Sequence, residues 1–360
     1  MTGTVAARQI TPQEVAAYFT RQLGAPVVIN KMKQSFPGVS RETWMVDAEV
    51  AGEKRGFALR IDHPWGSSCA YSLRQEWEVY SRLWKSQVPV AEPLWFDQDI
   101  EFAQGRPHMV RNLVDGSTNI PGLADATAEG AKLRQRIAFE CAEKLALVHT
   151  LDWKAVGLDT ILPEPKNHKD ALREELQCWR KLWDNGGTRP DPLIEDALCW
   201  LDELLPAETP FVSLCKGNNG LGEEIWRGEK IVAMSDWEMA CLSDGTLDLA
   251  FSQGTLTLAD FGATLRHYEK CVGHDVSPQR LAGGMFVTWF KMYVSVQVYM
   301  AKHYYDGSDL RIVQLSFGEI VGRAIHRRLA ACIGTKDIVA AWASVSNQEQ
   351  SSYFRVEEKK

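Results

Sequence analysis

Residues 211–250 read FVSLCKGNNGLGEEIWRGEKIVAMSDWEMACLSDGTLDLA, and this stretch decides the fold. An apolar run predicts a strand over Phe211–Cys215, and two further short strands are predicted over Glu224–Arg227 and Ile231–Met234. The polar, glycine-rich segment between the first two strands predicts a loop. The last strand leads directly into Asp236-Trp237-Glu238. Amide and charged side chains therefore gather in one loop and at one strand end.

This layout resembles the aminoglycoside phosphotransferases, kinase-like enzymes that act on small molecules. In that family the loop reads His-Gly-Asp-x-x-x-x-Asn, and the later strand ends on an Asp. In the branch associated with acyl-CoA dehydrogenases this Asp commonly stands in Asp-Trp-Glu. Here Lys216-Gly217-Asn218 and Glu223 occupy the loop positions, whereas Asp236 is retained, and the stretches Leu242–Gly245 and Asp248–Ala250 also resemble the family. The resemblance therefore implies that the metal-binding half of the motif is kept and the proton-accepting half is changed.

The amide at position 218 changes the expected chemistry. In a kinase the loop Asp orients the attacking hydroxyl and accepts its proton. Asn218 has no useful basicity, and loss of a general base typically lowers the rate roughly 10²- to 10⁴-fold. No Asp or His occurs between Phe211 and Ser235, so that no shift of register restores the motif. Slow phosphoryl transfer is still compatible with this loop.

The other loop residues offer different chemistry. Glu223 and Asp236 supply the hard oxygen ligands that magnesium prefers. Lys216 would neutralise a phosphate or carboxylate, or would act as an acid, base or imine-forming nucleophile if burial lowers its pKa. Together with Asn218, Glu223 and Glu224, Lys216 forms a candidate catalytic set that would bind an oxyanion and move a proton. An ordinary hairpin loop with solvated charges is the alternative.

The N-terminal third predicts a small sheet, because residues 27–35, 42–50 and 55–61 have strand patterns. The loop between the first two contains Ser40 and is similar to the family's nucleotide-covering loop. Arg60 stands where the family has its phosphate-binding lysine, and Glu76 stands where a helix Glu pairs with that residue. The resemblance implies that these three residues bind cofactor. An edge-strand Arg and a surface Glu are the alternative.

The resemblance implies an N-terminal β-rich lobe over residues 1–114, a helical lobe over 115–343 that contains the loop segment 211–250, and a polar tail over 344–360. A long amphipathic helix over Ala128–Leu151 ends in a segment similar to the same branch, and its His149 is interpreted as a hydrogen-bonded structural residue. Further helices are predicted over Lys169–Trp183, Pro192–Leu205, Thr257–Val272, Pro278–Tyr304 and Leu310–Ile333. Aromatic side chains on these helices and beside the loop would wall an apolar pocket or fill the core: Trp179, Trp183, Trp237, Trp289, Phe290, Tyr293 and Tyr299.

Composition limits the partners. The 360 residues carry a net charge of −7 without a basic stripe, which argues against nucleic acid and anionic membrane. The N-terminus lacks the apolar core of a signal peptide, and Met285–Met300 is too short and too polar for a membrane span, so that a cytoplasmic location is expected. The eight cysteines have no zinc-binding spacing and are interpreted as reduced residues, mostly of the core.

The expected fold is α+β: a bilobal, protein-kinase-like fold of the aminoglycoside phosphotransferase type, with a small antiparallel sheet lobe and a larger helical lobe. Three functions fit the sequence. The first is a repurposed enzyme that binds a hydrophobic or aromatic small molecule between the lobes and performs lyase, isomerase or hydrolase chemistry. The second is a magnesium- and ATP- or GTP-dependent small-molecule phosphotransferase with an atypical loop. The third is a non-catalytic pseudokinase.

Overall fold

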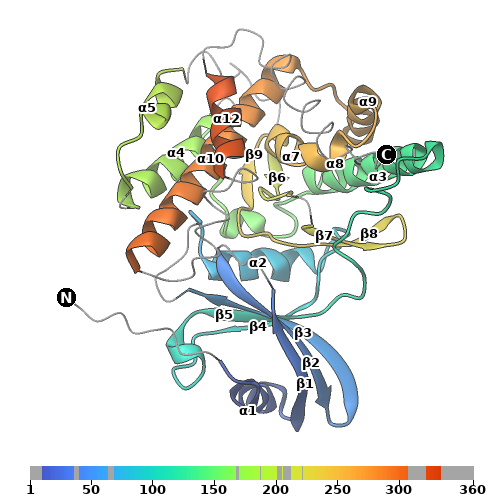
Figure 1. The fold of residues 1–360 in the computed structure, drawn as a ribbon, viewed down its shortest axis with the longest axis vertical. Helices are drawn as coiled ribbons and strands as arrows, with labels where there is room; N and C mark the ends of the chain where they lie inside the picture. The colour runs from blue at the N-terminus through green and yellow to red at the C-terminus, as the bar shows by residue number, and fades with distance from the viewer. Residues whose placement is uncertain are drawn as a thin grey trace, which may run out of the picture.

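Two lobes make up the computed structural model, which describes residues 10–35, 40–63, 69–167, 170–186, 188–200, 205, 212–220, 222–306 and 322–333. Figure 1 shows a sheet with one helix below it at one end of the molecule and a larger group of helices at the other. Helix α2 (Leu73–Leu83) lies between the sheet and the helical lobe (Figure 1). The expected bilobal kinase-like fold is therefore confirmed.

The smaller lobe is built on one antiparallel sheet in the order β1-β2-β3-β5-β4. Its central strand β3 pairs with β2 and β5, and Arg60 of this strand faces Thr43 on one side and Met109 on the other. The edge-strand alternative for Arg60 is therefore wrong. The elements of this lobe are α1 (Pro12–Leu23), β1 (Val27–Gln34), β2 (Arg41–Val50), β3 (Glu53–Asp62), α2 (Leu73–Leu83), β4 (Pro93–Asp97), the short 3₁₀ helix η1 (Ala103–Gly105) and β5 (His108–Asn112).

Helix α1 was not predicted from the sequence pattern. Its first turn is closed by a capping box, in which the Thr11 hydroxyl accepts from the Glu14 amide while the Glu14 carboxylate accepts from the Thr11 amide. Pro12 follows the cap, where its missing N–H costs nothing. Tyr18 and Phe19 are fully buried and join the hydrophobic core of the sheet. This helix covers the sheet on the side away from the helical lobe (Figure 1).

The larger lobe contains two short antiparallel strand pairs, β6-β9 and β7-β8, among its helices. Residues 201–204, 206–211, 307–321 and 334–360 lie outside the described ranges, and the predictions made for them remain predictions. Within those ranges, no helix has the length and apolarity needed to cross a bilayer. The elements are α3 (Ala128–His149), η2 (Leu158–Thr160), α4 (Ala171–Asn185), α5 (Pro192–Cys199), β6 (Ser213–Cys215), β7 (Glu224–Arg227), β8 (Lys230–Met234), β9 (Cys241–Ser243), α7 (Thr246–Phe251), α8 (Gln253–Leu256), α9 (Phe261–Val272), α10 (Pro278–Asp306) and α12 (Gly322–Cys332).

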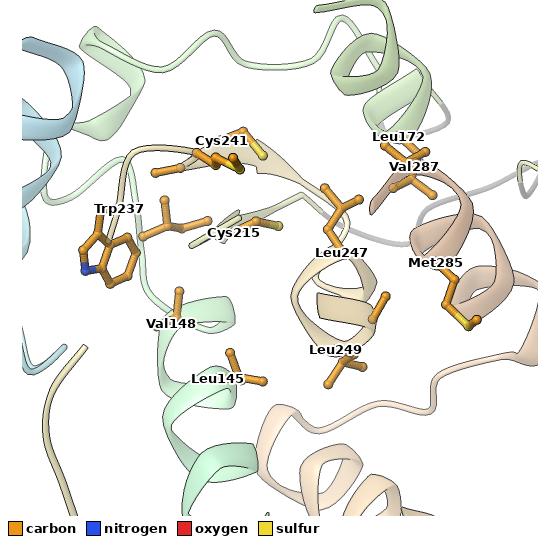
Figure 2. Close-up of a cluster of buried hydrophobic side chains, with 14 of the residues drawn as sticks. Leu145, Val148, Leu172, Cys215, Trp237, Cys241, Leu247, Leu249, Met285 and Val287 are labelled. Carbon is orange, nitrogen blue, oxygen red and sulfur yellow. The ribbon is translucent and has the colours of Figure 1, made fainter. Parts of the chain in front are cut away.

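The core of this lobe lies directly beneath β6 and β9. Figure 2 shows side chains from α3, α7 and α10 around Cys215 and Cys241, which face each other across the strand pair. The aromatic side chains proposed as pocket walls belong to this core: Trp179, Trp183, Trp237, Trp289, Phe290 and Tyr293 are all buried in it, whereas the side chain of Tyr299 lies outside the description. Close packing of this kind gives the strands and the loops attached to them a rigid base.

Helix α10 packs closely against α7 at Gly284, where an added Cβ would lie 2.5 Å from Thr246 Oγ1 and 2.6 Å from the Thr246 carbonyl carbon. We expect Gly284→Ala to lower the free energy of unfolding by about 1–3 kcal/mol, because backbone cannot move aside cheaply. Urea titration would measure this loss. Gly262→Ala on α9 is the matched control, since its nearest neighbours are side-chain atoms 3.3 Å away, and its effect should stay within about 0.5 kcal/mol.

Candidate functional site

The Asp248 carboxylate fixes the backbone of the loop that follows β6. Its two oxygens accept hydrogen bonds of 2.7 Å from the backbone amides of Lys216 and Gly217, and one of them also contacts His149 Nε2 at 3.1 Å. His149 Nδ1 contacts the Tyr268 hydroxyl at 2.6 Å. His149 is therefore hydrogen-bonded through both ring nitrogens, as predicted. Gly217 has φ of 80°, and a Cβ there would lie 2.0 Å from the Met239 carbonyl oxygen, so that glycine is required.

Asp236 lies two residues after the end of β8 in a strained conformation, with φ of 64°. Its backbone amide donates to the Tyr80 hydroxyl at 3.1 Å. Its Oδ1 accepts from Arg60 at 2.6 Å, and its Oδ2 accepts from the Asn218 amide at 2.6 Å. Burial acts to raise the pKa of Asp236, but Arg60, Lys216 and Arg41 together outweigh it and hold that pKa below its usual range. Asp236 is therefore an anion that the loop residue Asn218 and the sheet residue Arg60 hold from both sides.

Arg60 makes the predicted contact with Glu76, at 2.8 Å, and both side chains are buried. The same guanidinium also donates to Glu238 at 2.8 Å, so that it joins the sheet, α2 and the segment after β8. Burial raises the pKa of Glu76, and the nearby carboxylates of Glu238 and Asp236 add to this, whereas Arg60 and Arg41 oppose it; the result is a pKa of about 7. The surface-Glu alternative for Glu76 is therefore wrong.

Two members of this network were missed as site residues in the sequence: Arg41 and Glu238. Arg41 is fully buried and bonds Asp62 at 2.9 Å and Glu238 at 2.8 Å. The Ser40 hydroxyl donates to the same Glu238 oxygen at 2.5 Å. Ser40 thus lies near Arg60 as expected, although its hydroxyl binds a carboxylate. Glu238 follows Asp236 and Trp237 in the motif, which was the available signal; nothing in the strand pattern marks Arg41.

Lys216 is buried, and its ammonium group contacts the Asn218 carbonyl oxygen and lies 3.3 Å from Glu224 Oε1. Burial lowers the pKa of Lys216, but Glu224, Glu223, Asp236 and Asp248 together outweigh burial and raise it. The expectation of a nucleophile or base with a lowered pKa is therefore wrong. Lys216 is a protonated cation surrounded by carboxylates. Burial likewise raises the pKa of Glu224, against the opposing effect of Lys216.

Glu223 lies beside Asp236. Its pKa is raised well above the usual range, by burial and then by the Asp236 charge. Within the described residues, its side-chain oxygens make no hydrogen bond or ion pair. Two neighbouring carboxylates, of which one lacks a partner, form an oxygen donor set that fits a divalent cation. When bound there, such an ion would neutralise phosphate charge.

The fold and the site together define a kinase-like class of protein: a buried Arg–Glu pair in the sheet lobe faces a loop and an Asp in the helical lobe. The model of the phosphotransferase enzyme family, APH, matches residues 36–270, and the chain belongs to this family. Two curated proteins match parts of the chain at 25% identity or less. Mouse acyl-CoA dehydrogenase family member 10 is 25% identical over 189 residues, which are 51% of this chain and 17% of that protein. Chicken acyl-CoA dehydrogenase family member 11 is 22% identical over 247 residues, 62% of this chain and 31% of that protein.

Both comparisons leave most of the relatives' length unmatched, since the chain spans less than a third of the second and less than a fifth of the first. Solved structures share the fold. A protein from Ralstonia eutropha JMP134 assigned to the aminoglycoside phosphotransferases superposes with a TM-score of 0.63 at 18% identity, covering 94% of this chain and 99% of that one. A thermostable mutant of aminoglycoside phosphotransferase APH(4)-Ia in complex with ADP and hygromycin B has a TM-score of 0.56 at 16% identity, covering 85% of this chain and 99% of that one.

The raised pKa of Glu76 predicts how stability depends on pH. Between about pH 4.5, the ordinary value, and about pH 7, the folded state holds a proton that the unfolded state has released. The free energy of unfolding should therefore fall as pH rises through this window. Urea titrations from pH 4.5 to 8 should show a shallower fall for Glu76→Gln than for the wild type. An unchanged slope would mean that Glu76 titrates normally.

Proposed function

We propose that the protein is a small-molecule phosphotransferase that uses a nucleoside triphosphate and a divalent cation. One observation carries this proposal: Asp236 bonds Asn218 of the loop and Arg60 of the sheet, and beside it lies the Glu223 carboxyl group, which has no partner among the described residues. Phosphoryl transfer depends mainly on positioning and charge neutralisation, which such a cluster supplies. Membership of the phosphotransferase family supports the same reaction type.

In this proposal Asp236 and Glu223 hold the cation, and Arg60 binds phosphate. Asn218 hydrogen-bonds the acceptor hydroxyl and orients it without taking its proton. The acceptor oxygen forms the new P–O bond while the bond to the nucleoside diphosphate oxygen breaks, and the hydroxyl proton passes to a phosphate oxygen. Lys216 remains protonated throughout and fixes the loop through Glu224 and the Asn218 carbonyl.

The protonated state of Lys216 argues against the non-phosphorylating reaction that its residue type suggested. A lyase or imine-forming mechanism needs a neutral amine, whereas the surrounding carboxylates raise the pKa of Lys216. A non-catalytic nucleotide-binding protein is the second candidate, and Asn218 favours it, because an amide cannot accept the hydroxyl proton. Turnover of any acceptor distinguishes the two.

Metal and nucleotide binding provide the first test. We expect magnesium with ATP or GTP to raise the melting temperature of the wild type, and Glu223→Gln to reduce this rise strongly, because one anionic cation ligand is lost. Glu229→Gln is the matched control, since Glu229 is an exposed acid paired with Arg136 on the surface. Absence of a metal-dependent shift in the wild type would exclude the phosphotransferase.

Position 218 provides the second test. Asn218→Asp restores a carboxylate where the hydroxyl proton is to be accepted, and its turnover should exceed that of the wild type roughly 10²- to 10⁴-fold. The measurement is the rate of nucleoside diphosphate release with each compound of an acceptor panel at saturating magnesium. Magnesium also offsets the repulsion between Asp236 and the new carboxylate at position 218. If neither protein turns over any acceptor while both bind nucleotide, the non-catalytic candidate is favoured.

A further inference from the structure

Helix α10 carries a lysine for which the proposed reaction has no role so far. Lys291 is fully buried, and within the described residues its ammonium group has no hydrogen-bonding or ion-pair partner. Its Nζ lies 5.9 Å from the centroid of the Phe251 ring at the end of α7. Burial of an ammonium group is strongly unfavourable unless an anion compensates it.

Asn219 in the loop after β6 is a second buried group without partners. It is 4% exposed, and neither its Oδ1 nor its Nδ2 makes a hydrogen bond within the described part of the chain. The next residue, Gly220, approaches the same aromatic ring, since a Cβ there would lie 3.6 Å from Phe251 Cε1. Ser252, which follows Phe251, is also buried, and its hydroxyl makes no hydrogen bond to any residue that the structure describes. The ammonium group of Lys291 and the backbone of the loop at Gly220 therefore approach the same ring.

The nearby acid does not supply the missing bond. Burial acts to raise the pKa of Asp248. The hydrogen bond from His149 and, to a smaller extent, the charge of Lys291 lower it, and the net shift is downward. Both Asp248 oxygens already accept bonds from the loop amides and His149. No ion pair between Lys291 and Asp248 occurs in the residues that the structure describes.

We propose that Lys291 and Asn219 form an anion subsite for the acceptor, so that the acceptor is a small hydroxyl compound that carries one carboxylate. The ammonium group supplies the counter-charge, the Asn219 amide donates a hydrogen bond, and Phe251 contacts the apolar part. Asn218 is adjacent to Asn219, so that a hydroxyl on the same molecule is presented to the reaction centre. A polycationic acceptor is excluded by this charge. The inference rests on the proposed function for its chemistry, but its binding test does not.

The test uses two molecules of the same size and shape, hexanoate and hexanamide, titrated calorimetrically into the full chain without nucleotide. The wild type should bind hexanoate more tightly than hexanamide. Lys291→Met should weaken hexanoate binding about 10- to 100-fold and leave hexanamide binding unchanged, because only the charge-assisted bond is lost. Lys270→Met, at an exposed lysine on α9, should match the wild type.

Equal affinity of the wild type for the two molecules, or equal hexanoate affinity in Lys291→Met, would overturn the subsite. If Lys291→Met does not fold, Asn219→Leu takes its place and should weaken hexanoate binding by a smaller factor. A parallel titration with magnesium and ATP separates the two proposals, since Lys291 does not belong to the nucleotide site. Loss of nucleotide binding with retained hexanoate binding would contradict the phosphotransferase alone.

Discussion

The Arg60 guanidinium is the group on which the relation between the lobes depends. It donates to Glu76 on α2, to Asp236 after β8 and to Glu238 two residues later. A planar group with several donors is suited to this task, and a lysine would make the same bonds less selectively. Burial of so many charges adds little net stability, because desolvation offsets the attraction. What the network provides is a defined geometry, because it fixes how the sheet lobe and the helical lobe meet.

The sequence predicted well those residues that belong to a motif or to a clear strand pattern. Asp236, Glu76 and Arg60 are together, and the short strands Glu224–Arg227 and Ile231–Met234 are present with a one-residue extension. Helix α1 was missed although Thr11 and Glu14 form a capping box, because its apolar face is short. Arg41 and Lys216 show the limit of such reasoning. Their environment is made by residues far away in the chain, and no local pattern reveals burial or the sign of a pKa shift.

The charges of the residues that depart from the family's loop motif after β6 balance one another. The structure places Glu223, Glu224, Asp236 and Asp248 around one buried ammonium group, that of Lys216. A neutral Asn218 adds no further negative charge to this group of acids and donates to Asp236 instead. The loop therefore balances an excess of carboxylates with a lysine and an amide, while Asp248 holds its backbone through the amides of Lys216 and Gly217.

The amide of Asp236 donates to the Tyr80 hydroxyl, and Tyr80 belongs to α2, as does Glu76. The left-handed backbone at Asp236 leaves little freedom to adjust if this helix moves. A displacement of α2 would therefore alter, at once, the direction of the Asp236 carboxylate and its distance from the Arg60 charge that keeps it ionised. Movement of this helix would thus change the acid strength of Asp236.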